Sequence, residues 1–222
     1  MQRGRKATEA IVLLSGGIDS ATCLCLSRRE GKATRALTVE IHGTAAAELR
    51  AARLLGRRVG VLEHRFVSIP DLKEARDIEG SRWLSGEEVP ATYIPMKNAV
   101  FYSMAAAFAE ERGSHRLVGG HNLDDRRAFE DTGEAFFSSL EKALLASSPR
   151  LRMNGLKIVR PLRDKSKAEV VALAARIRVP LELTWSCHRA GEAHCWRCDG
   201  CASRVKAFEG AGVEDPLRAG NG

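Results

Sequence analysis

The residues best suited to chemistry follow the first apolar run of the chain. Residues 10–14 read Ala-Ile-Val-Leu-Leu, typical of a strand buried on both faces, and Ser-Gly-Gly-Ile-Asp-Ser comes directly after them. Two glycines let the backbone turn sharply and approach a ligand closely. Amides of such a loop and of the helix behind it converge on an anion, and serine hydroxyls add donors. We therefore predict that a pyrophosphate group binds at Ser15, Gly16, Gly17, Asp19 and Ser20.

This loop is neither of the two most familiar phosphate-binding patterns. It lacks the Gly-Lys-Ser/Thr of the Walker motif and the Gly-x-Gly-x-x-Gly of dinucleotide-binding proteins. The simpler alternative is an ordinary turn in which Asp19 or Ser20 only caps the next helix. The complete hexapeptide resembles the PP-loop of the ATP pyrophosphatases. That resemblance implies cleavage of ATP between its α and β phosphates and adenylation of a substrate oxygen.

Four of the six cysteines form a second candidate site near the end of the chain. They are Cys187, Cys195, Cys198 and Cys201. Four thiolates in overlapping Cys-x-x-Cys steps suffice for one closed tetrahedral Zn²⁺ site, which favours a structural role over a catalytic one. His188 and His194 are possible substitute ligands, and a redox Cys-x-x-Cys or an iron–sulfur cluster are the alternatives. Cys23 and Cys25 are expected in the core.

Composition limits the class of protein. The 222 residues suit one domain with a small appendage, and no apolar run reaches the roughly 20 residues of a membrane span. The apolar stretch after the basic start is also too short for a secretion signal, so we expect a cytoplasmic protein with no membrane partner. The net charge of +7 is spread along the chain, which favours a solvated surface over a dedicated nucleic-acid surface.

The apolar pattern alternates between strands and helices. Strands are expected at residues 10–14, 35–41, 61–69, 116–119 and 157–159, and helices at 19–29, 45–59, 98–111, 134–146 and 166–178. This alternation predicts an α/β fold with a doubly wound, mostly parallel, Rossmann-like sheet. We expect a PP-loop domain at residues 8–183 and a zinc-binding C-terminal segment at 184–217, packed on it.

Four further stretches point to one family. They are Tyr-Ile-Pro-Met-Lys-Asn at 93–98, Pro-Leu-Arg-Asp-Lys-Ser-Lys at 161–167, Thr-Trp-Ser-Cys at 184–187 and Gly-Val-Glu-Asp-Pro at 212–216. Together with the PP-loop and the cysteines, they resemble the 7-cyano-7-deazaguanine synthase family (QueC), especially its archaeal-type members. The resemblance covers roughly residues 10 to 217.

The resemblance implies a two-step reaction. ATP adenylates the carboxylate of 7-carboxy-7-deazaguanine, and ammonia displaces AMP to give an amide. A second ATP activates the amide oxygen, and loss of AMP leaves the nitrile, preQ0, which feeds queuosine or archaeosine in tRNA. The family also implies Mg²⁺ with the ATP, one structural Zn²⁺ and a homodimer.

Site residues carry over from the family by position. Lys167 and Asp19 would be catalytic, and Asn98, Lys97, Asp131, Phe129 and His121 would contact the substrate. A carboxylate such as Asp131 suits a guanine-like edge because it can accept from a ring N–H and an exocyclic amine. The alternatives are a solvated Lys167, an Asp131 that caps the following helix, and a His121 without a function.

Several positions depart from the family pattern. Lys97 and Glu130 replace an arginine and a proline, Trp196 replaces a glycine, and residues 42–46 differ after the second strand. Lysine cannot make the planar two-pronged contact of arginine. The adenylation step is therefore better supported than nitrile formation. The alternatives are a QueC-like enzyme of a defence system that passes the acyl group to a protein amine, and a non-enzymatic zinc module that binds nucleic acid.

Overall fold

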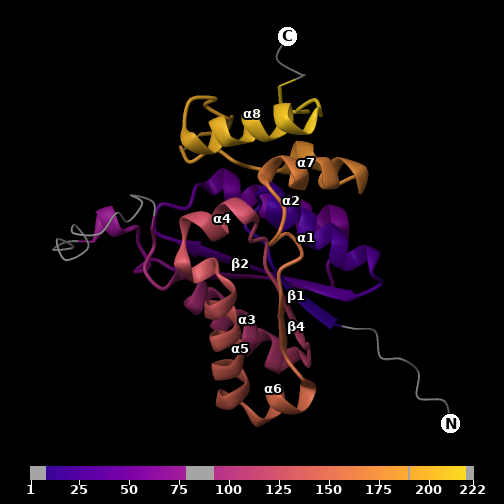
Figure 1. The fold of residues 1–222 in the computed structure, drawn as a ribbon, viewed down its shortest axis with the longest axis vertical. Helices are drawn as coiled ribbons and strands as arrows, with labels where there is room; N and C mark the ends of the chain where they lie inside the picture. The colour runs from indigo at the N-terminus through magenta and orange to yellow at the C-terminus, as the bar shows by residue number, and fades with distance from the viewer. Residues whose placement is uncertain (1–8, 79–92, 190, 219–222) are drawn as a thin grey trace.

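Five parallel strands form a single sheet at the centre of the protein. The computed structural model describes residues 9–78, 93–189 and 191–218. The strands are β1 (Glu9–Leu13), β2 (Ala33–Ile41), β3 (His64–Ile69), β4 (Arg116–Val118) and β5 (Lys157–Val159), in the order β3-β2-β1-β4-β5. All five predicted strands are present, and the predicted fold class is confirmed. Figure 1 shows the sheet with helices packed around it.

The long helices begin and end within two residues of their predicted bounds. They are α1 (Ile18–Arg29), α2 (Ala46–Val59), α3 (Lys97–Arg112), α5 (Glu134–Ser147) and α7 (Lys167–Arg176). The sequence analysis missed α4 (Leu123–Ala128), α6 (Pro149–Asn154), α8 (Asp199–Ala211) and the 3₁₀ turns at Glu130–Thr132 and Leu181–Leu183. Another 3₁₀ turn, Ala75–Asp77, lies in the polar stretch after β3, whose sequence predicts a loop with fragments of helix. The helices α4 and α6 are too short to show a helical period. The helix α8 begins directly after the N-cap Cys198, inside the stretch that the sequence analysis treated only as a metal-binding segment.

Both faces of the sheet are covered, as the unbroken apolar run of β1 predicts. Ala10 and Val12 pack into a cluster with side chains of α1, α7 and α8. Ile11, which points to the other face, packs with side chains of α3, α5 and α6. Cys23 and Cys25 lie in the first cluster, so they are the core residues that the sequence predicts. Among the described residues, no helix has the length and apolarity to cross a membrane.

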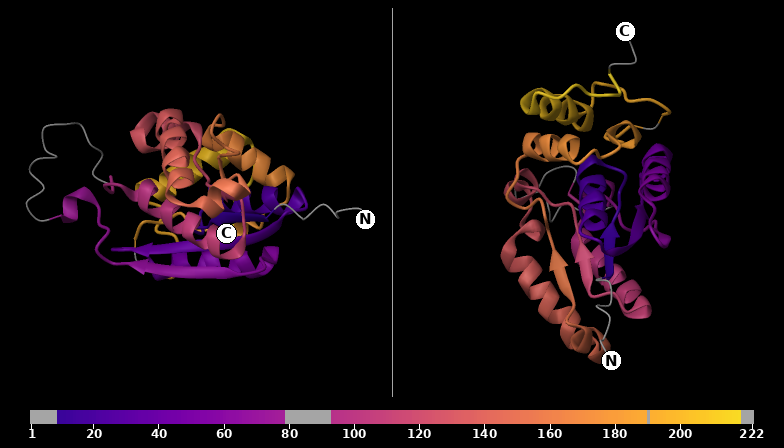
Figure 2. Two further views of the ribbon diagram at one scale, coloured as in Figure 1. Left: turned by 90° about the horizontal axis from the view of Figure 1, so that it is seen from below. Right: turned by 90° about the vertical axis from the view of Figure 1, so that its right-hand side faces the viewer.

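The C-terminal helix α8 packs on the same face of the sheet as α1 and α7. It lies along α7 in views at right angles to each other (Figures 1 and 2). Ala207 and Phe208 of α8 belong to the same apolar cluster as β1. The cysteine-bearing segment therefore shares the core of the sheet domain, and the boundary between residues 183 and 184 stays a prediction.

The strand order reverses between β1 and β4. Connections from β1 lead to β2 and β3 on one side, whereas β4 and β5 lie on the other. At such a switch point the loops that leave the carboxyl ends of the strands diverge and open a crevice. The glycine–serine loop at 15–20 leaves β1 here, and residues 119–121 leave β4 beside it.

Candidate nucleotide site and metal centre

The loop after β1 presents hydroxyls and unpaired helix amides to the crevice. Ser15 Oγ and Ser20 Oγ lie 3.2 Å apart, and the amide of Gly17 donates to Ser15 Oγ over 3.3 Å. Gly17 is the N-cap of α1, and no side chain caps that helix. The alternative in which Asp19 or Ser20 is only a cap is therefore wrong. The free first turn of α1 can bind an anion.

Two glycines are required by close backbone contacts around this loop. Gly16 has φ of +99°, and a Cβ atom there would lie 2.7 Å from the carbonyl oxygen of Glu48 in α2. A Cβ on Gly120, after β4, would lie 2.9 Å from the carbonyl carbon of Asp19. The absence of these side chains allows α2 and the β4 loop to press against the β1 loop.

A cleft of about 500 Å³ opens over the loop. This volume is within the range of small-molecule sites. One wall carries predicted residues: Ser15, Gly17, Asp19, Ser20, Lys97, Asn98, His121 and Lys167. The C-terminal part of the chain also lines the cleft, through Trp185, Ser186, His188, Asp199, Gly200, Ser203 and Arg204, none of which the sequence analysis assigned to the site. These residues belong to the cysteine-bearing segment, which thus completes the cleft.

Lys167 and Asp19 form an ion pair inside the cleft. Lys167 is the first residue of α7, and its Nζ contacts Asp19 Oδ2. Burial alone would lower the pKa of Lys167, but Asp19, Asp125 and Asp124 together raise it above the ordinary value. Lys167 is therefore a charged side chain that Asp19 holds beside the loop, and it is not the solvent-exposed lysine of the alternative interpretation.

A short cap places more carboxylates beside this pair. Asn122 caps α4 by accepting from the amides of Asp124 and Asp125, and its Nδ2 donates to Asp19 Oδ2 over 3.4 Å. Burial raises the pKa of Asp125. The Asn-x-x-Asp spacing at 122–125 is a readable capping-box signal that the sequence analysis missed. Among the described residues Asp19 Oδ1 is buried without a hydrogen-bond partner, so these oxygens fit a hard cation such as Mg²⁺.

A smaller cavity of about 110 Å³ adjoins the cleft. All five predicted substrate residues line it: Lys97, Asn98, His121, Phe129 and Asp131. Asn98 Nδ2 donates to the main-chain oxygen of Asp131 over 3.0 Å. The N-cap of α5 is Gly133 and no side chain caps that helix, so the alternative role of Asp131 as its cap is wrong.

His121 stands in the wall between the two cavities. Its ring lies 5.1 Å from that of Phe137 and 5.9 Å from that of Tyr102. Burial, with the nearby charges of Lys97 and Arg160, lowers the pKa of His121 to about 3. The imidazole is therefore neutral at physiological pH, with one donor and one acceptor nitrogen.

Glu48 lies beside the loop, and the sequence analysis did not single it out. It lies in the first turn of α2, whose backbone touches the loop at Gly16. Burial raises the pKa of Glu48 to about 7, although the charge of Lys97 acts in the opposite direction. No motif drew attention to it, because a glutamate in a first helical turn is common for helix stability alone.

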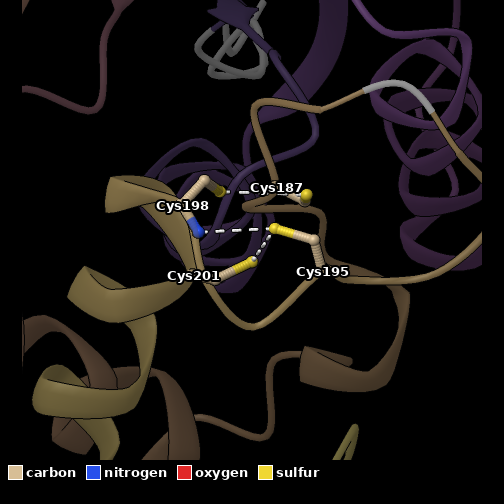
Figure 3. Close-up of side chains that lie close together, drawn as sticks. All are labelled: Cys187, Cys195, Cys198 and Cys201. Carbon is tan, nitrogen blue, oxygen red and sulfur yellow. Dashed lines mark hydrogen bonds between the residues drawn. The ribbon is translucent and has the colours of Figure 1, made fainter.

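The four cysteines converge as the sequence predicts (Figure 3). All four Sγ atoms lie within 4.8 Å of one another. Cys198 and Cys201 come from the start of α8, and Cys187 and Cys195 come from the preceding loop. Backbone amides donate to three of the sulfurs, among them Cys198 N to Cys195 Sγ over 3.3 Å. Four converging thiolates with N–H···S support fit Zn²⁺.

The flanking side chains explain one departure from the family pattern. His194 Nε2 accepts from the amide of Ser186 over 3.1 Å, and its ring packs between Trp185 and Trp196, so it is not needed as a ligand. Trp196 has φ of +55°, a left-handed conformation that a glycine adopts without strain. The tryptophan keeps that conformation and gains ring contacts.

The fold and the site define a PP-loop nucleotide-binding protein. The fold of a 4-thiouridine synthetase, solved with RNA and bound ATP, is similar at a TM-score of 0.53 and 18% identity, over 92% of this chain and 50% of that chain.

The sequence comparison then gives the family. The family model for queuosine biosynthesis protein QueC matches residues 9–212, and the chain belongs to this family. The 7-cyano-7-deazaguanine synthase of Thermoplasma acidophilum is 36% identical, over 94% of this chain and 91% of the relative. The enzyme of Pseudomonas fluorescens is 34% identical, over 94% of each chain.

Substitution of Gly16 tests the crowded loop. Gly16→Ala combines a left-handed backbone with a clash against the Glu48 carbonyl, and we expect about 2–4 kcal/mol of destabilisation and loss of ATP binding. Gly31→Ala is the matched control, since Gly31 has φ of +70° but open space around it, and should cost only about 1 kcal/mol. Chemical denaturation and calorimetric ATP titration measure both; equal effects would contradict the close contact.

Removal of one thiolate tests the metal centre. Cys201→Ser should abolish stoichiometric zinc and lower the free energy of unfolding by about 4 kcal/mol or more, because a closed site contributes directly to folding. Cys25→Ser, in the core but outside the cluster, should keep one zinc per chain. Elemental analysis and thermal melts give both results; unchanged zinc in Cys201→Ser would refute the site.

Glu48 predicts a pH dependence of stability. Its folded-state pKa is raised to about 7 from an ordinary 4.5, so the folded state loses stability as pH rises through this window. Glu48→Gln removes this loss and should raise stability by about 1–3 kcal/mol at pH 8 but little at pH 5. Glu63→Gln is the control: because Arg112 lowers the pKa of Glu63, this substitution should lower stability at pH 8, where Glu48→Gln raises it. Thermal melts of both variants at pH 5 and pH 8 test this prediction. An equal gain in stability of Glu48→Gln at both pH values would contradict the raised pKa of Glu48.

Proposed function

We propose that this protein is a 7-cyano-7-deazaguanine synthase, which converts 7-carboxy-7-deazaguanine, ATP and ammonia into preQ0 with release of AMP and pyrophosphate. Full-length relatives with this activity in their names support the proposal. The observation that carries it is the shared wall of the two cavities. Lys97, Asn98 and His121 line both, so an acid bound in the small cavity would meet a nucleotide bound in the cleft.

The first half-reaction would use the cleft. Ser15, Gly17 and the first turn of α1 would bind the phosphates, and the Lys167 cation would stabilise charge as a carboxylate oxygen attacks the α-phosphorus. Pyrophosphate leaves, and an acyl adenylate forms. Ammonia then adds to the acyl carbon, AMP departs with one carboxylate oxygen, and a proton is lost to give the amide.

The second half-reaction would repeat the adenylation on the amide oxygen. AMP leaves with that oxygen, and the nitrogen loses both protons to leave the nitrile. The Asp131 carboxylate would hold the guanine-like edge throughout. Mg²⁺ at the Asp19 oxygens would neutralise phosphate charge, and Zn²⁺ at the four cysteines would hold the C-terminal wall.

A second candidate differs only in the acceptor. Lys97, in the wall common to both cavities, stands where the family has an arginine, and this change falls between the two cavities. A QueC-like enzyme of a defence system, which joins the acyl group to a protein amine, is the corresponding proposal. A zinc module that only binds nucleic acid would not require the loop and lysine pair.

The assembly, location and subfamily are further proposals. We propose a cytoplasmic homodimer, as the family resemblance implies. Relatives from an archaeon and from bacteria are similarly identical to this chain, at 36% and 34–36%. The archaeal-type assignment therefore rests on the sequence motifs alone and stays a prediction.

A product assay tests the proposal. Purified protein with 7-carboxy-7-deazaguanine, ATP and ammonium should form the nitrile by mass spectrometry, with two AMP per nitrile. Lys167→Met should lower kcat by about 10²-fold or more, as expected for loss of one charge-stabilising group. Arg163→Met, an exposed cation four residues earlier, should change kcat less than twofold.

The products also separate the candidates. Release of an amide or an adenylate without nitrile, together with a mass shift on a co-expressed protein, would favour the protein acceptor. Neither AMP nor a modified deazaguanine would refute both.

A further inference from the structure

A fully buried arginine in α8 connects residues 181–186 to Asp215 through hydrogen bonds. Arg204 of α8 is 1% exposed and makes a two-pronged ion pair with Asp215, at 2.7 and 2.9 Å. Its Nη1 donates to Thr184 Oγ1 over 2.8 Å and to Ser186 Oγ over 3.4 Å, and its Nη2 also donates to the carbonyl of Leu181 over 3.3 Å. These contacts use all five N–H donors of the guanidinium. Arg204 therefore lines the cleft without a donor left for a phosphate.

The two hydroxyls that Arg204 holds flank the residue that touches the loop. Trp185 lies between Thr184 and Ser186, and its backbone amide donates to the carbonyl oxygen of Gly16 over 2.9 Å. A Cβ atom on Gly17 would lie 3.7 Å from the Trp185 carbonyl oxygen. The position of Trp185 therefore fixes how the loop turns above β1.

The metal centre holds the same segment from its other end. Cys187 follows Ser186 directly, and the Trp185 indole donates to the Cys187 carbonyl over 2.7 Å. Cys201 lies one turn before Arg204 on α8. The cysteine cluster and Arg204 thus act on residues 184–187 from one rigid helix.

We infer that Arg204 is a positioning residue for the nucleotide loop: through Thr184 and Ser186 it holds the Trp185 amide against Gly16. The inference rests on the proposed function only in taking ATP as the ligand of the cleft. Arginine is required here because lysine offers three donors from one atom and cannot bind Asp215, Thr184 and Leu181 in one plane.

Nucleotide binding without turnover tests this inference. Arg204→Lys should keep one zinc per chain but weaken binding of an ATP analogue with a methylene group between the α and β phosphorus atoms, by about tenfold in calorimetry. In steady state the KM for ATP should rise by a similar factor, whereas the KM for 7-carboxy-7-deazaguanine should change less than twofold.

A control variant and a second variant at the same contact complete the test. Arg35→Lys weakens a half-buried arginine paired with Glu9 at the amino end of the sheet, and should leave analogue binding within twofold. Thr184→Val removes the hydroxyl that accepts from Arg204 and should weaken analogue binding in the same direction, even if Arg204→Lys does not fold.

The outcomes separate this inference from the proposed function. Analogue affinity unchanged in a folded, zinc-bound Arg204→Lys or Thr184→Val protein would overturn the inference. Loss of zinc or of the folded state in both variants would also overturn it, because Arg204 would then be structural only. A wild-type protein that binds the analogue but forms no nitrile would refute the proposed function and leave the inference intact.

Discussion

The turn at Gly16 is the constraint on which the rest of the site depends. Its backbone is left-handed, the first turn of α2 fills the space where a side chain would lie, and its carbonyl accepts from Trp185. Gly120 brings the β4 loop equally close to Asp19. Because three segments meet one turn without intervening side chains, a small displacement of any of them moves the phosphate-binding amides. Catalytic geometry is sensitive to such shifts, since a misplacement of about 1 Å can cost 10²-fold in rate.

The buried ion pair between Arg204 and Asp215 serves to position its neighbours more than to stabilise the fold. Taking the charges of Arg204 and Asp215 out of water costs several kcal/mol, and well-packed apolar residues often replace such pairs at no loss of stability. Burial alone would raise the pKa of Asp215, but the hydrogen bonds from Arg204 and from the Leu217 amide lower it, so the pair stays charged. The charge and the planar geometry of the guanidinium fix the directions of its hydrogen bonds, whereas an apolar contact has no preferred direction.

The sequence predicted the parts of the fold that local patterns encode. Five strands, five long helices, the loop at 15–20 and the four cysteines all follow from periodicity, glycine chemistry and ligand spacing. It did not predict that α8 forms a wall of the cleft, because that depends on α8 packing against α7. The partners of Arg204 were equally hidden, since Thr184 and Asp215 lie 20 and 11 residues away in the chain.

The closed metal centre makes sense as part of this positioning. A Zn²⁺ held by all four thiolates would have no position for a reactive water, so its contribution would be structural. The segment from residue 184 contains one helix of 13 residues, and Ala207 and Phe208 of that helix reach the core cluster of the sheet domain. The loop before that helix carries Cys187 and Cys195, and a metal bound by the four thiolates would add a constraint to the packing of the helix. The four-cysteine cluster and Arg204 thus hold residues 184–187 from two sides, and these residues contact the loop after β1 through Trp185.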